Sequence, residues 1–169
     1  MMSEAQNNVE KHPWTSELVR FQDCDPLGHL NNGKYIDYFM NAREDHLRDF
    51  YNLDIYEISK SNGFGWVVMQ NQISYLKPAF LNEKIVIESM LIHYDSYSVL
   101  VELKMWNEKK TQLKSVMWTR FVSVNLQTGK KMTIPGEFYL LEELLVPIDI
   151  SKGFDHRISQ LLQETKTAV

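Results

Sequence analysis

The chain has 169 residues, of which 44% are apolar and 12% aromatic, so it is long enough for one domain with a full core and is not a disordered segment. Its formal net charge of −4 excludes the broad basic surface typical of nucleic-acid-binding proteins, and its single cysteine excludes an intrachain disulfide. No apolar run reaches the roughly 18 residues of a membrane span, and residues 1–13 are polar without a signal-peptide core, so we expect a mobile tail there and a cytoplasmic protein.

A strand and a polar loop are expected first. Residues 15–21 read as a strand, and Pro26 and Gly28 predict a loop over residues 23–28. The loop and the residues after it hold a tight group of polar side chains: Asp23, Asp25, His29, Asn31 and Asn32. This group makes the stretch the candidate functional site.

A long amphipathic helix should follow, from Asn32 to about Phe50. Apolar residues recur there at steps of three and four, which is the spacing of one helix face, and Asn31 or Asn32 is a suitable N-cap. The face comprises Tyr35, Tyr38, Phe39, Ala42, His46, Leu47 and Phe50. Such large side chains predict a helix packed deeply against a sheet.

The rest of the chain is predicted to be mainly strands. After a connection with a short helical turn, strands are expected over residues 66–76, 84–92, 97–106 and 112–124. In the third of these, alternate residues predict one buried face: Tyr97, Val99, Val101, Leu103 and Met105. Helical patterns return over residues 137–145 and 155–163. One helix among five strands predicts an α+β fold with a largely antiparallel sheet.

Asp25 is the candidate catalytic residue because it lies just before the expected helix start. The first amides of a helix have unpaired N–H groups and carry about half a positive charge. Those amides can stabilise an oxyanion while a nearby carboxylate attacks a carbonyl or activates water. The structural alternative is that Asp25 only closes a turn over Pro26. Asp23 is the other available carboxylate, and we expect it to shape the loop.

The sequence D-x-D-P-x-G-H-x-N-N-x-x-Y at residues 23–35, followed by Ala42-Arg43, resembles the opening motif of hotdog-fold acyl-CoA thioesterases, in particular the 4-hydroxybenzoyl-CoA thioesterase-like group. The order of elements also fits over residues 14–135. The resemblance implies a curled antiparallel sheet wrapped around a long central helix, and an acyl-CoA thioesterase that forms a homodimer or a dimer of dimers. Residues 136–169 would be a C-terminal helical extension of the same domain.

The resemblance also implies roles for individual residues. Asp25 would be the nucleophile or the general base, and the sequence does not separate these two routes. Residues expected to form the oxyanion hole or position the substrate are Gly28, His29, Asn31, Asn32, Gly33, Tyr35 and Gly65. Among them the backbone N–H of Asn32 is preferred as oxyanion donor over that of Gly33. His29 and Asn31 can equally be structural, and Gly65 can be a simple turn glycine.

Lys77, Lys84 and Arg120 are candidate contacts for the CoA phosphates, and nothing in the sequence chooses among them. Glu44 lies ~18 Å along the helix from its start, too far to serve the same site. Cys24 lies between two aspartates that should raise its thiol pKa, so we expect a packing residue. The chain has no P-loop, G-x-G-x-x-G, C-x-x-C or H-E-x-x-H motif, so neither a metal nor a redox cofactor is expected.

Three alternative functions stay open. Acyl-carrier-protein thioesterases have a related motif, but usually with asparagine two residues before the histidine, where this chain has Leu27. Hotdog enoyl-CoA hydratases have an N-P-x-H-type pattern, whereas His29 lies three residues after Pro26. A non-catalytic acyl-binding protein could have the same fold, because a fold does not determine a function.

Overall fold

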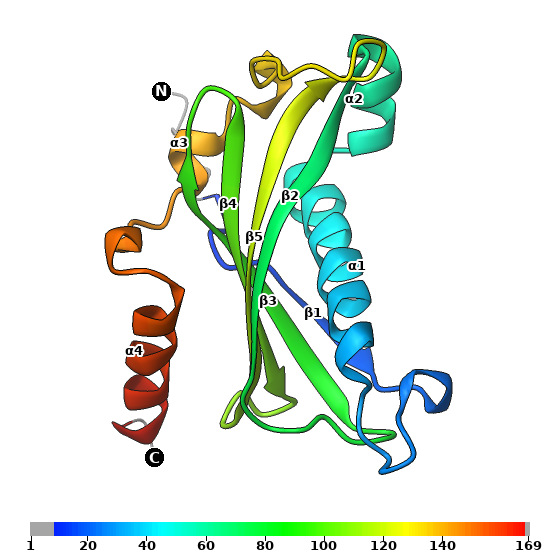
Figure 1. Ribbon diagram of the computed structural model, residues 1–169, viewed down its shortest axis with the longest axis vertical. Helices are drawn as coiled ribbons and strands as arrows, with labels where there is room; N and C mark the ends of the chain where they lie inside the picture. Colours follow the sequence, from blue (N-terminus) through cyan, green and yellow to red (C-terminus); the bar gives the residue numbers. More distant parts are fainter. Residues whose placement is uncertain (1–8, 168–169) are drawn as a thin grey trace, which may run out of the picture.

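A five-stranded antiparallel sheet wraps around one long helix in the computed structural model, which describes residues 9–167 (Figure 1). The strands lie in the order β1-β3-β4-β5-β2. They comprise β1 (Trp14–Leu18), β2 (Phe64–Tyr75), β3 (Lys84–Tyr94), β4 (Ser98–Asn107) and β5 (Leu113–Asn125). The helices are α1 (Asn32–Tyr51), α2 (Ile55–Asn62), α3 (Leu141–Leu144) and α4 (Phe154–Thr167), with 3-10 turns η1 (Phe21–Asp23), η2 (Gly136–Phe138) and η3 (Ile150–Lys152). The predicted α+β architecture with a C-terminal helical extension is confirmed.

Local sequence determines both ends of α1. The side chain of Asn31 accepts a hydrogen bond from the Gly33 N–H at 2.9 Å, so Asn31 is the N-cap. The helix ends at Tyr51, and its C-cap residue Asn52 adopts a left-handed conformation with φ of 53°. The predicted stripe is buried at Tyr35, Phe39, Ala42 and His46, whereas Phe50 is 42% exposed and Tyr51 closes the buried face instead.

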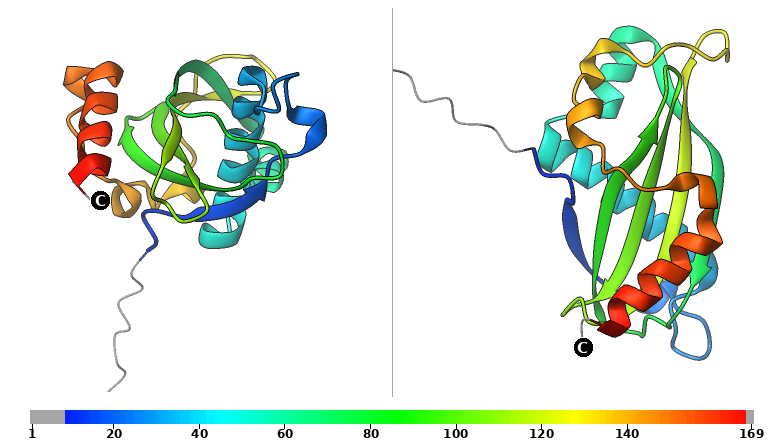
Figure 2. Two further views of the ribbon diagram at one scale, coloured as in Figure 1. Left: turned by 90° about the horizontal axis from the view of Figure 1, so that it is seen from below. Right: turned by 90° about the vertical axis from the view of Figure 1, so that its left-hand side faces the viewer.

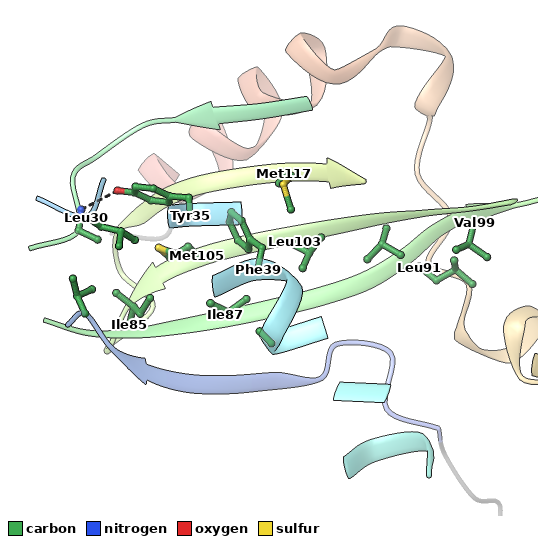
Figure 3. Close-up of a cluster of buried hydrophobic side chains, with 14 of the residues drawn as sticks. Leu30, Tyr35, Phe39, Ile85, Ile87, Leu91, Val99, Leu103, Met105 and Met117 are labelled. Carbon is green, nitrogen blue, oxygen red and sulfur yellow. Dashed lines mark hydrogen bonds between the residues drawn. The ribbon is translucent and has the colours of Figure 1, made fainter. Parts of the chain in front are cut away.

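The concave face of the sheet holds the main core, which packs on α1. Leu30, Tyr35 and Phe39 meet strand residues that include Ile87, Leu103 and Met117 (Figure 3). In β4 the predicted face is confirmed, because Val99, Val101, Leu103 and Met105 all belong to this core, although Leu100 and Glu102 between them are also buried, on the opposite face. Tyr97 was wrongly included: it precedes the strand and is 41% exposed. This core fixes α1, and with it the helix start, against the sheet.

The opposite face of the sheet is covered by the C-terminal extension, with α4 on the far side of the sheet from α1 (Figure 2). Trp118 of β5 packs edge-to-face on Phe154 with ring centroids 5.4 Å apart. Ile158 and Leu161 are buried as predicted, while Leu162 is 37% exposed. The sheet is therefore covered on both faces, and its outer side carries a second apolar cluster.

Three predicted boundaries differ from the structure. The first strand ends at Leu18 because the following residues turn into η1, where Phe21 is 81% exposed. The expected short turn before β2 is the eight-residue helix α2, whose N-cap Asp54 accepts N–H groups of two first-turn residues. The expected helix over 137–145 is interrupted and forms only η2 and α3. Among residues 9–167 no helix has both the length and the apolarity needed to cross a bilayer.

Candidate active site

A tight turn holds the Asp25 carboxylate in place. Its Oδ1 accepts hydrogen bonds from the N–H groups of Leu27 at 2.8 Å and His29 at 3.1 Å. The Gly28 N–H donates to the Asp25 carbonyl at 3.0 Å, and Gly28 has a φ of +74°, a conformation that favours glycine. The turn expected as a structural alternative is thus present. It occupies only one carboxylate oxygen, and Oδ2 has no hydrogen-bond partner within residues 9–167.

The carboxylate lines an open pocket of about 230 Å³ at the start of α1. We call it the Asp25 pocket, and its lining residues are Asp25, His29, Leu30, Asn32, Tyr35, Tyr75, Leu76, Lys77 and Pro78. Asn32 is the first residue of α1, so its N–H has no intrahelical acceptor, and none is found elsewhere in the described part of the chain. The Gly33 N–H is already bonded to Asn31. The available helix-start donor is therefore the Asn32 N–H.

The loop after β2 forms the second wall of the Asp25 pocket, a feature that sequence reasoning missed. The Leu30 N–H donates to the Ala79 carbonyl at 2.8 Å, and the Leu81 N–H donates to the Gly28 carbonyl at 2.9 Å. The Ala79 N–H donates in turn to the Tyr35 hydroxyl at 3.2 Å. Only the Lys77-Pro78 break marked this loop in the sequence, and it was read as the end of a strand.

The remaining polar residues of the motif support the loop. Asp23 accepts a hydrogen bond from the Tyr38 hydroxyl at 2.9 Å. Burial, the hydroxyl's bond to Asp23 and that carboxylate's charge raise the pKa of Tyr38 to about 12. The His29 ring packs edge-to-face on Phe80 at 5.0 Å, and its backbone rather than its ring bonds Asp25. Burial, and then the charges of both aspartates, raise the pKa of the Cys24 thiol, the predicted direction.

Three predicted site residues lie away from this pocket in the same subunit. Gly65 is at the opposite end of β2, about 33 Å from Tyr75 at 3.3 Å per residue; a Cβ there would meet Leu126 Cδ2 at 2.7 Å. Lys84 pairs with an exposed glutamate, Glu108, at 3.0 Å. Arg120 faces the outer side of the sheet and donates to Ser98 Oγ at 3.3 Å. Of the three candidate phosphate contacts, only Lys77 lies beside Asp25.

A second, mostly apolar cavity of about 160 Å³ lies at the far end of α1. We call it the apolar cavity. It is bounded by α1, the concave face of the sheet and the segment that contains η2 and α3. Its lining residues are Met40, Arg43, Glu44, Leu47, Leu53, Ile55, Trp66, Leu91, Val99, Val101, Phe121, Phe138, Leu140, Leu141 and Leu144.

Two charged side chains of α1 border this apolar cavity. Glu44 accepts hydrogen bonds from Arg48 at 3.1 Å and from the Tyr56 hydroxyl at 3.2 Å. Arg43 donates to Ser89 Oγ at 3.1 Å, and the same hydroxyl lies 2.8 Å from His46 Nδ1. Burial, and then the charge of Arg43, lower the pKa of His46 to about 3, so His46 is neutral near pH 7. Arg43 of the motif and His46 therefore join α1 to β3 through Ser89.

A family model described as the thioesterase-like superfamily matches residues 19–144, a span that begins before Asp25 and ends at the last residue of α3. This match covers more than half of the chain. The chain belongs to the thioesterase-like superfamily. The hotdog thioesterase inferred from the residue 23–35 motif is thereby confirmed at the level of family and fold, and α4 lies outside the matched span.

Individual relatives agree with this membership. The thioesterase is 28% identical over 123 residues to the long-chain acyl-CoA thioesterase FadM of Escherichia coli strain K12, covering 73% of this chain and 91% of FadM. The crystal structure of YbaW, a probable thioesterase of Escherichia coli, has 27% identity and a TM-score of 0.67, covering 79% of this chain and 98% of YbaW. The fold also matches Slr0204, a 1,4-dihydroxy-2-naphthoyl-CoA thioesterase of Synechocystis, with 16% identity, a TM-score of 0.71, and coverage of 77% and 94%.

Within residues 9–167 no group of three or more histidine, cysteine, aspartate or glutamate side chains is arranged to hold a metal ion. Asp23 and Asp25 lie two positions apart, but the Asp23 carboxylate accepts a hydrogen bond from the Tyr38 hydroxyl and the Asp25 carboxylate accepts one from the Leu27 N–H.

Proposed function

We propose that this thioesterase hydrolyses an acyl-CoA to a carboxylic acid and free CoA, with Asp25 as the nucleophile or general base. The observation that carries the proposal is the Asp25 pocket, whose lining includes both Asp25, with an unbonded carboxylate oxygen, and Asn32, with an unbonded N–H group. Thioester hydrolysis needs these two functions: one group that attacks or activates water, and one donor for the oxyanion. The similarity to FadM, whose substrates are long-chain acyl-CoA thioesters, supports CoA as the carrier.

The reaction would proceed by acyl transfer to oxygen. The Asn32 N–H polarises the thioester carbonyl, and Asp25 either attacks the carbonyl carbon or removes a proton from an attacking water. The C–S bond then breaks, and the CoA thiolate leaves and is protonated by solvent. In the nucleophile route a water then hydrolyses the mixed anhydride and regenerates Asp25, whereas in the general-base route Asp25 releases the proton that it took from water. Lys77, on the wall of the Asp25 pocket, is our candidate contact for a CoA phosphate.

The test is release of free thiol from short-chain, long-chain and aromatic acyl-CoA, with the corresponding acyl-carrier-protein thioesters assayed in parallel. Turnover of the CoA esters supports the proposal. Turnover of the carrier-protein esters alone would show that the substrate is an acyl-carrier-protein thioester rather than an acyl-CoA. Binding without turnover of any ester would identify an acyl-binding protein instead.

We also propose a homodimer formed through the free edge of β2. Strand β2 is an edge of the sheet, and its middle exposes apolar side chains: Val67 is 48%, Val68 43% and Met69 69% exposed. An edge strand of this kind is a ready site for pairing with another strand. Antiparallel pairing of two β2 strands about a two-fold axis near Met69 would join the two sheets and cover these side chains.

This dimer would complete the site. Tyr75, at one end of β2, lines the Asp25 pocket, whereas Gly65 and Trp66 are at the other end, beside the apolar cavity. Antiparallel pairing places the partner's Gly65 and the partner's Trp66 next to Tyr75. Each Asp25 pocket would then adjoin the apolar cavity of the other subunit. This arrangement gives Gly65, which is remote from Asp25 within one subunit, a place at the thioester.

Met69→Glu should convert the dimer to monomers, because the two introduced carboxylates would face each other across the two-fold axis. We expect a halved mass in analytical ultracentrifugation and loss of thioesterase activity. Leu162→Glu is the matched control, because Leu162 is 37% exposed and lies on α4 rather than on the β2 edge. A Met69→Glu variant that stays dimeric would rule out this interface.

The apolar cavity is the proposed site for the acyl group. At about 160 Å³ it resembles in size an engineered apolar cavity that accommodates benzene. Phe138 lines this cavity, and its ring centroid lies 5.4 Å from those of both Phe64 and Trp66. It is contributed by η2, so the segment after β5 would limit the length of acyl group that can be buried.

Phe138→Leu should shift the substrate preference towards longer acyl chains, because it replaces a large lining side chain of the apolar cavity with a smaller one. Each additional buried methylene stabilises a complex by ≈ 0.8 kcal/mol, or about fourfold in kcat/KM. The measurement is kcat/KM across saturated acyl-CoA of increasing length for wild type and variant. An unchanged length profile in a folded variant would place the acyl group elsewhere.

We further propose that residues 136–167 belong to the same domain as the sheet, because α4 buries Trp118 and Leu100 against that sheet. A cytoplasmic location remains our expectation on the basis of the single cysteine.

A further inference from the structure

Lys114 is a buried lysine that the proposed chemistry does not use. It lies on β5, its side chain is 1% exposed, and its Nζ has three acceptors. These are Glu83 Oε1 at 2.8 Å, the Pro78 carbonyl at 2.8 Å and Gln112 Oε1 at 3.2 Å. An ammonium group has three N–H donors, so all of them are satisfied. A buried charge is tolerated only with such partners, so the Lys114 ammonium group must stay next to these three acceptors.

Two of the three acceptors belong to the loop that walls the Asp25 pocket. Pro78 and Glu83 are near opposite ends of this loop, so the one ammonium group ties both ends to β5. The second carboxylate oxygen of Glu83 accepts the Phe80 N–H at 2.9 Å. Lys114 Nζ also lies 5.7 Å from the centroid of the Phe80 ring. The loop is therefore fixed in its middle as well.

The same loop holds the residues around Asp25 through backbone contacts. Ala79 accepts from the Leu30 N–H, and Leu81 donates to the Gly28 carbonyl, while the Phe80 ring packs on His29. These contacts lie on both sides of the His29 N–H that bonds Asp25 Oδ1. A shift of the loop would move the carboxylate and the pocket wall together.

We propose that Lys114 is a positioning residue for Asp25, acting through residues 78–83. The proposal rests on the catalytic role of Asp25 argued above. Lys114 is behind the pocket wall and does not line the pocket. Its loss should therefore alter the geometry of the chemical step more than the binding of acyl-CoA. Misplacing a catalytic group by about 1 Å lowers a rate about 10²-fold.

The experiment compares Lys114→Met with Lys104→Met. Lys104 is the matched control because it is also a largely buried strand lysine, with 12% side-chain exposure and an ion pair to Glu88 at 3.2 Å. It faces the outer side of the sheet, away from the loop. Both variants are assayed well below their measured melting temperatures. Lys114→Met should lower kcat about 10²-fold with little change in KM, whereas Lys104→Met should retain wild-type kcat.

Two further variants distinguish positioning from general destabilisation. Lys114→Arg keeps the charge and several donors, so it should recover much of kcat. Glu83→Gln keeps the shape of Glu83 but removes the ion pair, so it should lower kcat in the same direction as Lys114→Met even if that variant does not fold. Equal kcat losses in Lys114→Met and Lys104→Met, or wild-type kcat in Glu83→Gln, would overturn the proposal. Absence of turnover in wild type would instead overturn the proposed thioesterase reaction.

Discussion

Asp25→Asn should lower kcat for acyl-CoA hydrolysis by about 10²–10⁴-fold, the usual contribution of a positioned acid–base group. Asparagine keeps an oxygen that can accept the Leu27 and His29 N–H groups, so the turn should survive. What it loses is the negative charge and basicity of the oxygen that faces the Asp25 pocket. KM should change little, because Asp25 is expected to contact the reacting carbonyl rather than the CoA carrier.

Asp23→Asn provides a control for this substitution two residues away. The Asp23 carboxylate accepts the Tyr38 hydroxyl, and asparagine can still do so. Its kcat should therefore stay close to wild type, with thiol release followed under saturating acyl-CoA. Full activity in Asp25→Asn would show that another group is the nucleophile or general base. A larger loss of kcat in Asp23→Asn than in Asp25→Asn would assign that role to Asp23.

A single turnover in water enriched in heavy oxygen distinguishes the nucleophile route from the general-base route for Asp25. If Asp25 only activates water, the first product acid formed in water with heavy oxygen carries the label. If Asp25 attacks the carbonyl and water then attacks the aspartyl carbon, the label enters Asp25 and the first product carries an unlabelled oxygen from the enzyme. Mass spectrometry of product and protein reads both outcomes.

Much of the fold was predictable because its signals are local. The step of three and four residues marked α1, and Asn31 marked its start to within one residue. Alternation in β4 identified the face, from Val99 to Met105, that belongs to the main core on α1. Tyr97 was misassigned because alternation continues past the end of a strand, and only the turn before Ser98 ends it. The helix predicted over residues 137–145 was wrong for a similar reason, since a helical spacing of apolar residues does not show where the helix is interrupted.

The parts of the candidate site that sequence reasoning missed depend on contacts between distant segments. The apolar cavity draws its walls from α1, four strands and α3, so no single window of sequence contains it. Lys114 was unremarkable because a lysine in a strand usually faces solvent. The bulge between Met105 and Trp106 in the β4–β5 pairing changes the register just where Lys114 lies, which alternation alone cannot reveal. Arg120 was grouped with the phosphate contacts because charge does not indicate which face of the sheet a residue occupies.

Arg157→Met should lower the free energy of unfolding by about 3–5 kcal/mol, because it leaves a buried carboxylate unpaired. Glu102 on β4 has 0% exposure and is held by Arg157 Nε and a second guanidinium nitrogen, each at 2.9 Å. Trp118 Nε1 donates to the same carboxylate at 2.8 Å. For a chain of this size the loss corresponds to a melting temperature lower by roughly 10 °C, measured by thermal unfolding.

The control for Arg157→Met is an exposed ion pair in the same C-terminal segment. Lys152→Met removes the pairing of Lys152 with Asp149 at 3.6 Å, where both side chains are more than half exposed, and should leave the melting temperature close to the wild-type value. Adding Glu102→Gln to Arg157→Met should restore part of the lost stability, because glutamine still accepts from Trp118 and carries no buried charge. Additive losses in the double variant would show that the guanidinium contributes by packing rather than by neutralising Glu102. Since α4 lies across the sheet from Asp25, kcat measured below the unfolding transition should stay at the wild-type value in all these variants.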